Sequence, residues 1–173
     1  MMSQLRIIFT GPNLGLVLEA LATIGDPPQA ITATDEAARR STAEISLRKR
    51  TLNLGGQEQV ILYAVNQPTH GAALRALLAD GGVGVVVLLD NREANSLAAF
   101  NFYRDQCRSL LEASKLVFGI IGLETQAKPS LMDYYMELRG IEPKPAIFEI
   151  DINRRADLAL LLEALLYALD PGV

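Results

Sequence analysis

The chain has 173 residues, half of them hydrophobic and 21% charged, a balance that fits one globular domain and excludes a disordered segment. It carries 16 basic and 20 acidic residues, and the net charge of −4 argues against non-specific nucleic-acid binding. A single cysteine and a single histidine exclude an internal disulfide, a cysteine-cluster zinc site and any site that needs two imidazoles.

No stretch of the chain has the length and apolarity of a membrane-spanning helix or the pattern of a secretory leader. A bilayer span needs about 20 apolar residues, and the longest candidate, Leu158 to Leu169, is interrupted by Glu163. We therefore expect a cytoplasmic protein without membrane insertion, in which Cys107 is reduced.

The first elements in chain order are a buried strand, a glycine-containing loop and a helix. The apolar run Leu5 to Phe9 predicts the strand, Gly11 to Gly15 the loop, and Leu16 to Ile24 the helix. The helix is expected to stop at the sequence Gly-Asp-Pro-Pro that begins at Gly25.

The next segments predict an antiparallel hairpin. Alternating polar and apolar residues from Ala43 to Leu54 lead through Gly55-Gly56 into the apolar segment Gln59 to Val65. A helix is then expected over Gly71 to Ala79, before a run of Asp and Gly residues.

The second half of the chain alternates strands and helices. Val83 to Leu89 is the clearest strand, because a continuous β-branched run is typical of a central strand buried on both faces. The later segments predict helices and strands in turn: Ser96–Leu111 helix, Leu116–Ile121 strand, Ser130–Leu138 helix, Ala146–Ile150 strand and Ala156–Leu169 helix. This alternation indicates one α/β domain over residues 1–173 with a mostly parallel sheet.

Helical spacing also predicts which aromatic side chains are buried. In the helix from Ser96, one face carries Phe100, Tyr103 and Cys107, followed by Leu110 or Leu111, and this face is expected in the core with Phe102 outside it. Adjacent Tyr134 and Tyr135 cannot both lie on one narrow buried stripe. Exposed aromatic residues of this kind indicate a protein interface.

The last helix is apolar nearly all round, with leucines at 158, 160, 161, 162, 165 and 166. This pattern fits either deep packing or contact with another chain, so a homo-oligomer stays open.

The loop after the first strand stands where α/β proteins often bind phosphate, because backbone N–H groups and the helix dipole favour anions there. The phosphate-loop motif G-x-x-x-x-G-K-[ST] supplies a lysine for the phosphates and a hydroxyl for magnesium. Counted from Gly11, the chain has Leu16 for the second glycine, Val17 for the lysine and Leu18 for the hydroxyl residue. Gly11 and Gly15 alone are more typical of a tight turn between strand and helix.

Several segments resemble the bacterial Ras-like small GTPases that are linked to cell polarity, gliding and pilus control. Ile7 to Pro12 resembles their first strand and phosphate loop, and Thr34 to Thr42 their first switch region. Leu62 to His70 resembles the third strand and the start of the second switch, and Gly84 to Arg92 the fourth strand and its exit loop. The resemblance implies a small-GTPase-like fold: a mostly parallel six-stranded sheet with helices on both faces and one antiparallel edge hairpin.

The departures from the family pattern fall on its chemistry. Besides the missing lysine and hydroxyl, Thr69 stands at the glycine that faces the terminal phosphate and His70 at the water-positioning glutamine. The guanine-reading N-K-x-D motif should fall near Gly122 to Thr125, where its Asn is a Gly and its Asp a Thr, and the last base loop near Asp151 to Arg155. Phosphoryl transfer depends on positioning and charge neutralisation, so the resemblance implies the fold and argues against the activity.

We therefore expect a catalytically inactive GTPase-like binding module with no cofactor and no metal. Its vestigial phosphate loop comprises Gly11, Pro12, Asn13 and Gly15, and His70 is the one weak catalytic candidate. The resemblance implies partner contacts through the two switch-equivalent segments, and the candidate residues there are Thr42, Ser46, Gln67, Pro68, His70 and Arg75. Roadblock-type proteins or pilus and motility components would be typical partners.

Other functions remain open on the sequence. The chain can be a weak or atypical nucleotide-binding GTPase or ATPase that regulates motility or pilus function, using Thr42 or His70. It can also be a structural subunit whose partner covers the last helix. The basic clusters Arg39-Arg40 and Arg48 to Arg50 fit a docking patch for an acidic partner as well as a solvated loop and hairpin face.

Overall fold

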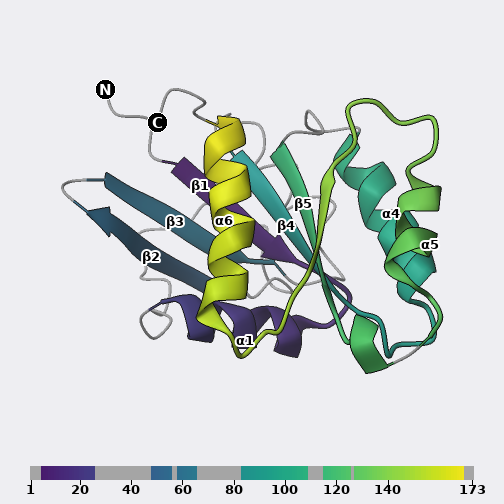
Figure 1. The fold of residues 1–173 in the computed structure, drawn as a ribbon. Helices are drawn as coiled ribbons and strands as arrows, with labels where there is room; N and C mark the ends of the chain where they lie inside the picture. Colours follow the sequence, from purple (N-terminus) through teal and green to yellow (C-terminus); the bar gives the residue numbers. More distant parts are fainter. Residues whose placement is uncertain are drawn as a thin grey trace, which may run out of the picture.

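A six-stranded sheet with helices on both faces organises the chain (Figure 1). The computed structural model describes residues 5–25, 48–55, 58–65, 83–108, 115–125 and 127–169. Within these ranges the strands are β1 (Leu5–Thr10), β2 (Arg48–Gly55), β3 (Glu58–Ala64), β4 (Val83–Asp90), β5 (Leu116–Ile121) and β6 (Ala146–Glu149). The helices are α1 (Leu14–Ile24), α4 (Ser96–Arg108), α5 (Leu131–Glu137) and α6 (Arg155–Leu169), with a 3-10 turn η3 (Leu123–Thr125).

The strand order is β2-β3-β1-β4-β5-β6, and only the β2–β3 pair is antiparallel. The predicted hairpin and mostly parallel sheet are thereby confirmed over the described residues. Residues 85–89 of β4 are fully buried, as the β-branched run predicted for a central strand. The helix expected over Gly71 to Ala79 lies outside the described residues.

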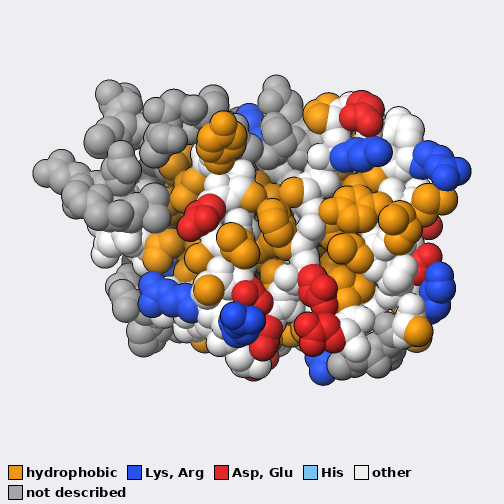
Figure 2. Space-filling model, in the orientation of Figure 1, with side chains coloured by type: hydrophobic (Ala, Val, Ile, Leu, Met, Phe, Trp, Pro, Cys, Tyr) orange, Lys and Arg blue, Asp and Glu red, His pale blue; other side chains and the backbone are white. Residues whose placement is uncertain are grey.

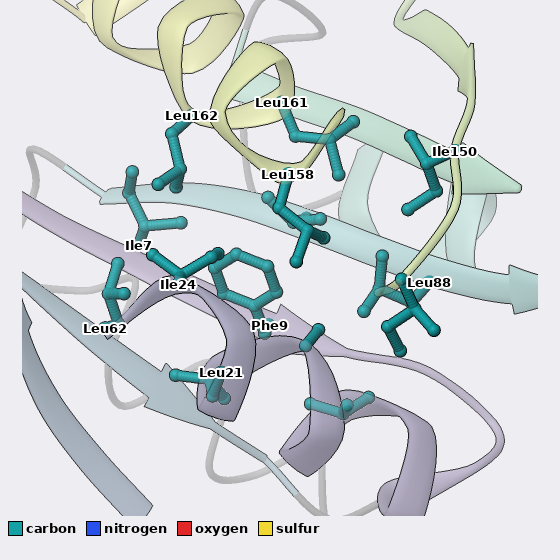
Figure 3. Close-up of a cluster of buried hydrophobic side chains, with 14 of the residues drawn as sticks. Ile7, Phe9, Leu21, Ile24, Leu62, Leu88, Ile150, Leu158, Leu161 and Leu162 are labelled. Atoms are coloured by element: carbon teal, nitrogen blue, oxygen red, sulfur yellow. The ribbon is translucent and has the colours of Figure 1, made fainter. Parts of the chain in front are cut away.

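Alternation along the central strands divides the core into two clusters. Ile7 and Phe9 of β1 face α1 and α6, and Figure 3 shows leucines of α6 meeting them from above. Ile8 between them points to the opposite face and joins the cluster formed with α4 and α5. The sheet therefore carries a packed helical layer on each side, as expected for parallel strands buried on both faces.

The helix faces follow the predicted spacing. In α4, Phe100, Tyr103 and Cys107 are at most 1% exposed, whereas Phe102 is 46% exposed. In α5, which is capped by Ser130, Tyr134 is fully buried and its neighbour Tyr135 is 40% exposed. Leu110 and Leu111 lie outside the described residues.

The last helix, α6, packs one face onto the sheet and leaves apolar side chains on the other. Its leucines at 158, 161, 162 and 165 are buried. A Cβ at Gly119 of β5 would lie 3.0 Å from a methyl of Leu161, so the glycine permits this close approach. Leu160 and Tyr167 are 50% and 69% exposed, and Figure 2 shows hydrophobic side chains at the surface over α6.

One basic residue of the hairpin is buried, so neither interpretation of the cluster holds for Arg50 itself. Arg50 of β2 is 6% exposed, and its guanidinium donates to the backbone carbonyls of Leu21 and Gly25 at the end of α1. The cation thus meets the negative end of the helix dipole. Arg50 is therefore neither solvated nor part of a docking patch.

Candidate functional site

The central strands β1 and β4 end side by side and send the chain to opposite faces of the sheet. After β1 the chain enters α1, and after β4 it enters α4, and these helices belong to different core clusters. Ligands of open α/β sheets bind outside the carboxyl ends of the strands at such a switch point. A crevice of about 610 Å³ lies here, lined by the loop after β1, the loop after β4 and α4.

The lining of this crevice is acidic and partly aromatic. Asp90 lines it from the end of β4, Glu93 from the loop that follows, and Phe102 from α4. Pro12 and Leu14 add apolar surface from the other side. Among its described lining residues there is no Lys, Arg or His, so the crevice offers an anion no cationic side chain of its own.

The loop after β1 lies directly against β4. A Cβ at Gly11 would stand 2.3 Å from the carbonyl oxygen of Leu88, a distance that only glycine avoids. Gly11 thus lets the loop pass close to the neighbouring strand. This is the structural role that glycine has in a tight turn between a strand and a helix.

The helix α1 begins earlier than the sequence pattern indicated. Instead of a loop through Gly15, only residues 11–13 separate β1 from α1, which begins at Leu14. Asn13 is the N-cap, and its Oδ1 accepts a hydrogen bond of 3.2 Å from the N–H of Leu16. A Cβ at Gly15 would lie 3.2 Å from that oxygen, so glycine leaves room for the cap. This local capping is the physical reason for the early start.

From Leu14 onward, the segment that was compared with a phosphate loop is therefore part of a helix. A phosphate loop leaves four residues between its glycines, and its backbone N–H groups surround the phosphates. Here Leu14 and Gly15 are helical, and Leu16, at the second glycine position, donates its N–H to Asn13. Val17, at the lysine position, is fully buried in the core, and Leu18 packs against the same cluster.

An ion pair fixes the loop after β4. The guanidinium of Arg92 donates to both carboxylate oxygens of Asp90, at 2.8 and 2.7 Å, and the Arg92 N–H adds a bond of 3.0 Å. The Asp90 side chain is only 11% exposed, whereas that of Arg92 is 55% exposed. The side-chain hydrogen bond from Arg92 holds the pKa of Asp90 below its ordinary value, against the effect of burial. Asp90 is thus a carboxylate at neutral pH.

Arg92 also covers the end of β5, where the resemblance places the start of the guanine-reading motif. Gly122 has a φ of +78°, and a Cβ there would lie 3.1 Å from Cγ of Arg92. The aliphatic part of Arg92 therefore lies on the Gly122 backbone. At the segment matching the last base loop, Asp157 accepts a hydrogen bond from the N–H of Asp151 at 2.9 Å, so its carboxylate holds this turn at the start of α6.

The buried side chain of Asn91 ties the crevice wall to two neighbouring elements. Its backbone N–H donates to Ile121 of β5, and its Nδ2 donates to the Pro129 carbonyl at 2.9 Å. The Tyr134 hydroxyl of α5 donates to Asn91 Oδ1 at 2.6 Å. These hydrogen bonds hold the loop after β4 in one conformation against β5 and α5.

A second buried tyrosine adjoins the crevice. Tyr103 of α4 is 1% exposed and its hydroxyl interacts with that of Thr10, at the end of β1. Burial raises the pKa of Tyr103 to about 12, and the interaction with Thr10 opposes this rise. The phenol therefore keeps its proton at neutral pH and is not a general base.

The structure brings together only some of the residues singled out in the sequence. Pro12 and Asn13 line the crevice, whereas Gly11 packs on β4 and Gly15 lies in α1. The partner and catalytic candidates all lie outside the described residues: Thr42, Ser46, Gln67, Pro68, His70 and Arg75.

Sequence reasoning missed Asp90, Glu93 and Phe102 as members of one site. For Asp90 and Glu93 the available signal was their position at and just after the end of the clearest predicted strand, because the carboxyl ends of parallel strands carry binding loops. Phe102 lies further along, in α4, and had no such signal. Within the described ranges, no three His, Cys, Asp or Glu side chains are grouped closely enough to hold a metal ion.

Comparison with protein-family models gives no match, and comparison with curated protein sequences gives none. None of the described helices combines the length and apolarity needed to cross a membrane.

Proposed function

We propose that the protein is a GTPase-like module without catalytic activity, which works in the cytoplasm by binding another protein. The strand order, with an antiparallel β2 beside an otherwise parallel sheet, is compatible with a P-loop-type fold. The fold alone does not fix a function, so the proposal depends on the site.

The observation that carries the proposal is the structure of the first turn of α1. Asn13 caps the helix, so a backbone donor that could bind phosphate is already satisfied within the chain. The carboxylate of Glu93 lines the crevice and disfavours a polyphosphate by like-charge repulsion, and that of Asp90, already paired with Arg92, adds to this more weakly. Val17 has no polar group with which to replace the phosphate-binding lysine.

Calorimetric titration of nucleotide-stripped protein with GTP, GDP and ATP, with and without magnesium, tests the absence of nucleotide binding. We expect no saturable heat at about 1 mM ligand, which corresponds to binding weaker than about −4 kcal/mol. A control variant, Asn13→Ala, removes the cap and frees the Leu16 N–H, and even this variant is expected to show no tight binding. Saturable binding of one nucleotide by the wild type would contradict the proposal.

Turnover is a separate test. We expect no GTP hydrolysis above buffer, and a turnover that disappears in His70→Ala would establish an enzyme instead.

The protein-binding half of the proposal needs its own test. The wild type and the double variant Arg75→Glu, Gln67→Ala serve as matched baits in the native lysate. A partner retained by wild type, lost by the variant and rebuilt with purified components supports binding through the switch-equivalent surface. Failure to rebuild any complex would contradict it.

A further inference from the structure

The acidic crevice has a second property that the proposed function does not use: it combines carboxylates with an exposed aromatic ring. Phe102 is 46% exposed and stands edge-to-face against Tyr103, with ring centroids 5.3 Å apart. Because Tyr103 is buried, this contact holds the Phe102 ring against a fixed neighbour, and Phe102 is one of the residues that line the crevice. An aromatic face beside carboxylates is a favourable environment for a cation.

We propose that the crevice between the loop after β1, the loop after β4 and α4 binds an arginine side chain of a protein partner. The inference rests on the proposed function, since it assigns a docking site to the same binding module. A planar guanidinium can stack on Phe102 while it donates to the exposed carboxylate of Glu93. The apolar surfaces of Pro12 and Leu14 suit the aliphatic part of the side chain.

Charge complementarity identifies the occupant as a cation. Glu93 is exposed at the crevice, and the protein carries a net charge of −4. Both carboxylate oxygens of Asp90 already accept hydrogen bonds from Arg92, so Asp90 is a weaker attraction than Glu93. The Asp90–Arg92 pair shows how a guanidinium binds a carboxylate of this surface, because two of the Arg92 nitrogens donate to the two oxygens of Asp90.

The size of the crevice favours a residue within a polypeptide over a free small amine. About 610 Å³ is in the range of sites for ligands much larger than one guanidinium. Chain flanking the arginine can therefore occupy the remaining space between Pro12 and Ala98.

The test is an NMR titration of the isotope-labelled full chain with a short capped glycine peptide that carries one central arginine. The matched neutral peptide replaces arginine by citrulline, which has nearly the same shape without the charge. We expect saturable shifts of amides at Asp90, Glu93 and Phe102 with the arginine peptide and much smaller ones with citrulline. Equal shifts with citrulline, or shifts located elsewhere, would overturn the proposal.

Four variants sharpen this titration. Glu93→Gln and Phe102→Leu should each weaken the arginine peptide about two- to fivefold. The controls Glu163→Gln and Tyr167→Leu remove a carboxylate and an aromatic ring at exposed positions on α6 and should leave the affinity unchanged. Equal affinity of all four variants would overturn the proposal.

A further variant should bind more tightly. Arg92→Gln removes the competing guanidinium and leaves the Asp90 carboxylate to the peptide, so its affinity should rise by at least about threefold. A fall would contradict the assignment, as would concentration-dependent shifts without peptide, which would indicate a second copy of the chain in the crevice. A lysine peptide that binds as tightly would overturn the choice of arginine.

The two proposals fail separately. If neither the arginine peptide nor any nucleotide binds, the crevice assignment is wrong and the binding module can still act through another surface. If GTP binds with saturable heat, the proposed function is wrong whatever the arginine peptide does.

Discussion

The hydroxyl of Tyr134 donates a hydrogen bond of 2.6 Å to Oδ1 of Asn91, and both side chains are fully buried. This contact joins α5 to the loop that forms the acidic wall of the crevice. Tyr134 also packs edge-to-face on Phe100, with ring centroids 5.3 Å apart, so its ring is held independently of its hydroxyl.

Tyr134→Phe should keep the ring packing and lose only the hydroxyl. Asn91 Oδ1 would then be a buried acceptor without this donor, and the unfolding free energy should fall by about 1–3 kcal/mol. Urea denaturation followed by circular dichroism measures the loss. The matched variant Tyr135→Phe, at a residue 40% exposed, should change stability by less than about 0.5 kcal/mol. Equal losses in the two variants would contradict the role of the buried bond.

Asn13→Ala should destabilise the protein through the first turn of α1. The side chain of Asn13 satisfies the Leu16 N–H, and loss of an N-cap costs about 1 kcal/mol. Asn13→Ser is the control, because serine also caps helices well and should preserve most of the stability. Thermal melts of the three proteins decide the point, and an unaffected Asn13→Ala protein would show that the cap contributes nothing.

Arg50→Met should weaken the attachment of the hairpin to α1. The variant keeps much of the aliphatic volume but removes the donor to the carbonyls of Leu21 and Gly25, the latter bond being 3.1 Å long. Hydrogen bonds that involve a charged group contribute about 1.5–3 kcal/mol, and a loss of this order is expected in chemical denaturation. Arg50→Lys keeps a cation at the helix end and should lose less. A lysine variant as unstable as the methionine variant would refute the importance of the charge.

The stability of the protein should decline at alkaline pH because of two buried acids in α4. Burial raises the pKa of Cys107 from 9.0 to about 12, and burial likewise raises that of Tyr103 from 10.0 to about 12. Above about pH 9 the unfolded chain releases these protons before the folded chain does, so unfolding becomes easier. The contribution is complete below about pH 9 and is lost as the pH rises toward 12.

Urea midpoints measured at about pH 8 and about pH 10.5 test this dependence. The double variant Cys107→Ala, Tyr103→Phe should show a smaller decline than the wild type, although both exchanges lower stability at every pH. Parallel declines in the two proteins would assign the effect to other groups.

Cys107 should also react with thiol reagents only after unfolding, because it is fully buried.

Local patterns predicted the parts of the fold that local physics determines. The β-branched run from Val83 identified the central strand β4, and helical spacing separated buried Tyr103 from exposed Phe102. In both cases the side chains of one short segment carry the information, because burial on a strand or helix repeats with a fixed period.

The start of α1 could have been predicted but was not. Two glycines made residues 11–15 look like an open loop, whereas Asn13 is a preferred N-cap residue and outweighed Gly15 inside the first turn. At this point the N-cap residue Asn13, and not the glycine content, determines where the helix begins.

The environment of Arg50 and the composition of the crevice could not be predicted from local patterns. Arg50 is buried by the end of α1, at Leu21, 29 positions away in sequence. Asp90 and Phe102 line one crevice only because α4 packs back beside the loop from which it starts. Such contacts depend on how the helices and strands pack together, so they cannot be inferred from the hydrophobic periodicity of a single segment.

The early start of α1 also limits how the sequence can change over evolutionary time. Exchanging Val17 for lysine and Leu18 for serine would restore the letters of a phosphate motif, but position 17 points into the core, where a cation is poorly tolerated. Lengthening the chain between Asn13 and Leu14 would instead open a loop at the strand end. A phosphate loop at this place therefore requires inserted residues, and substitutions alone would not produce one. The present length of the segment between β1 and α1 thus disfavours the conversion into a nucleotide-binding protein.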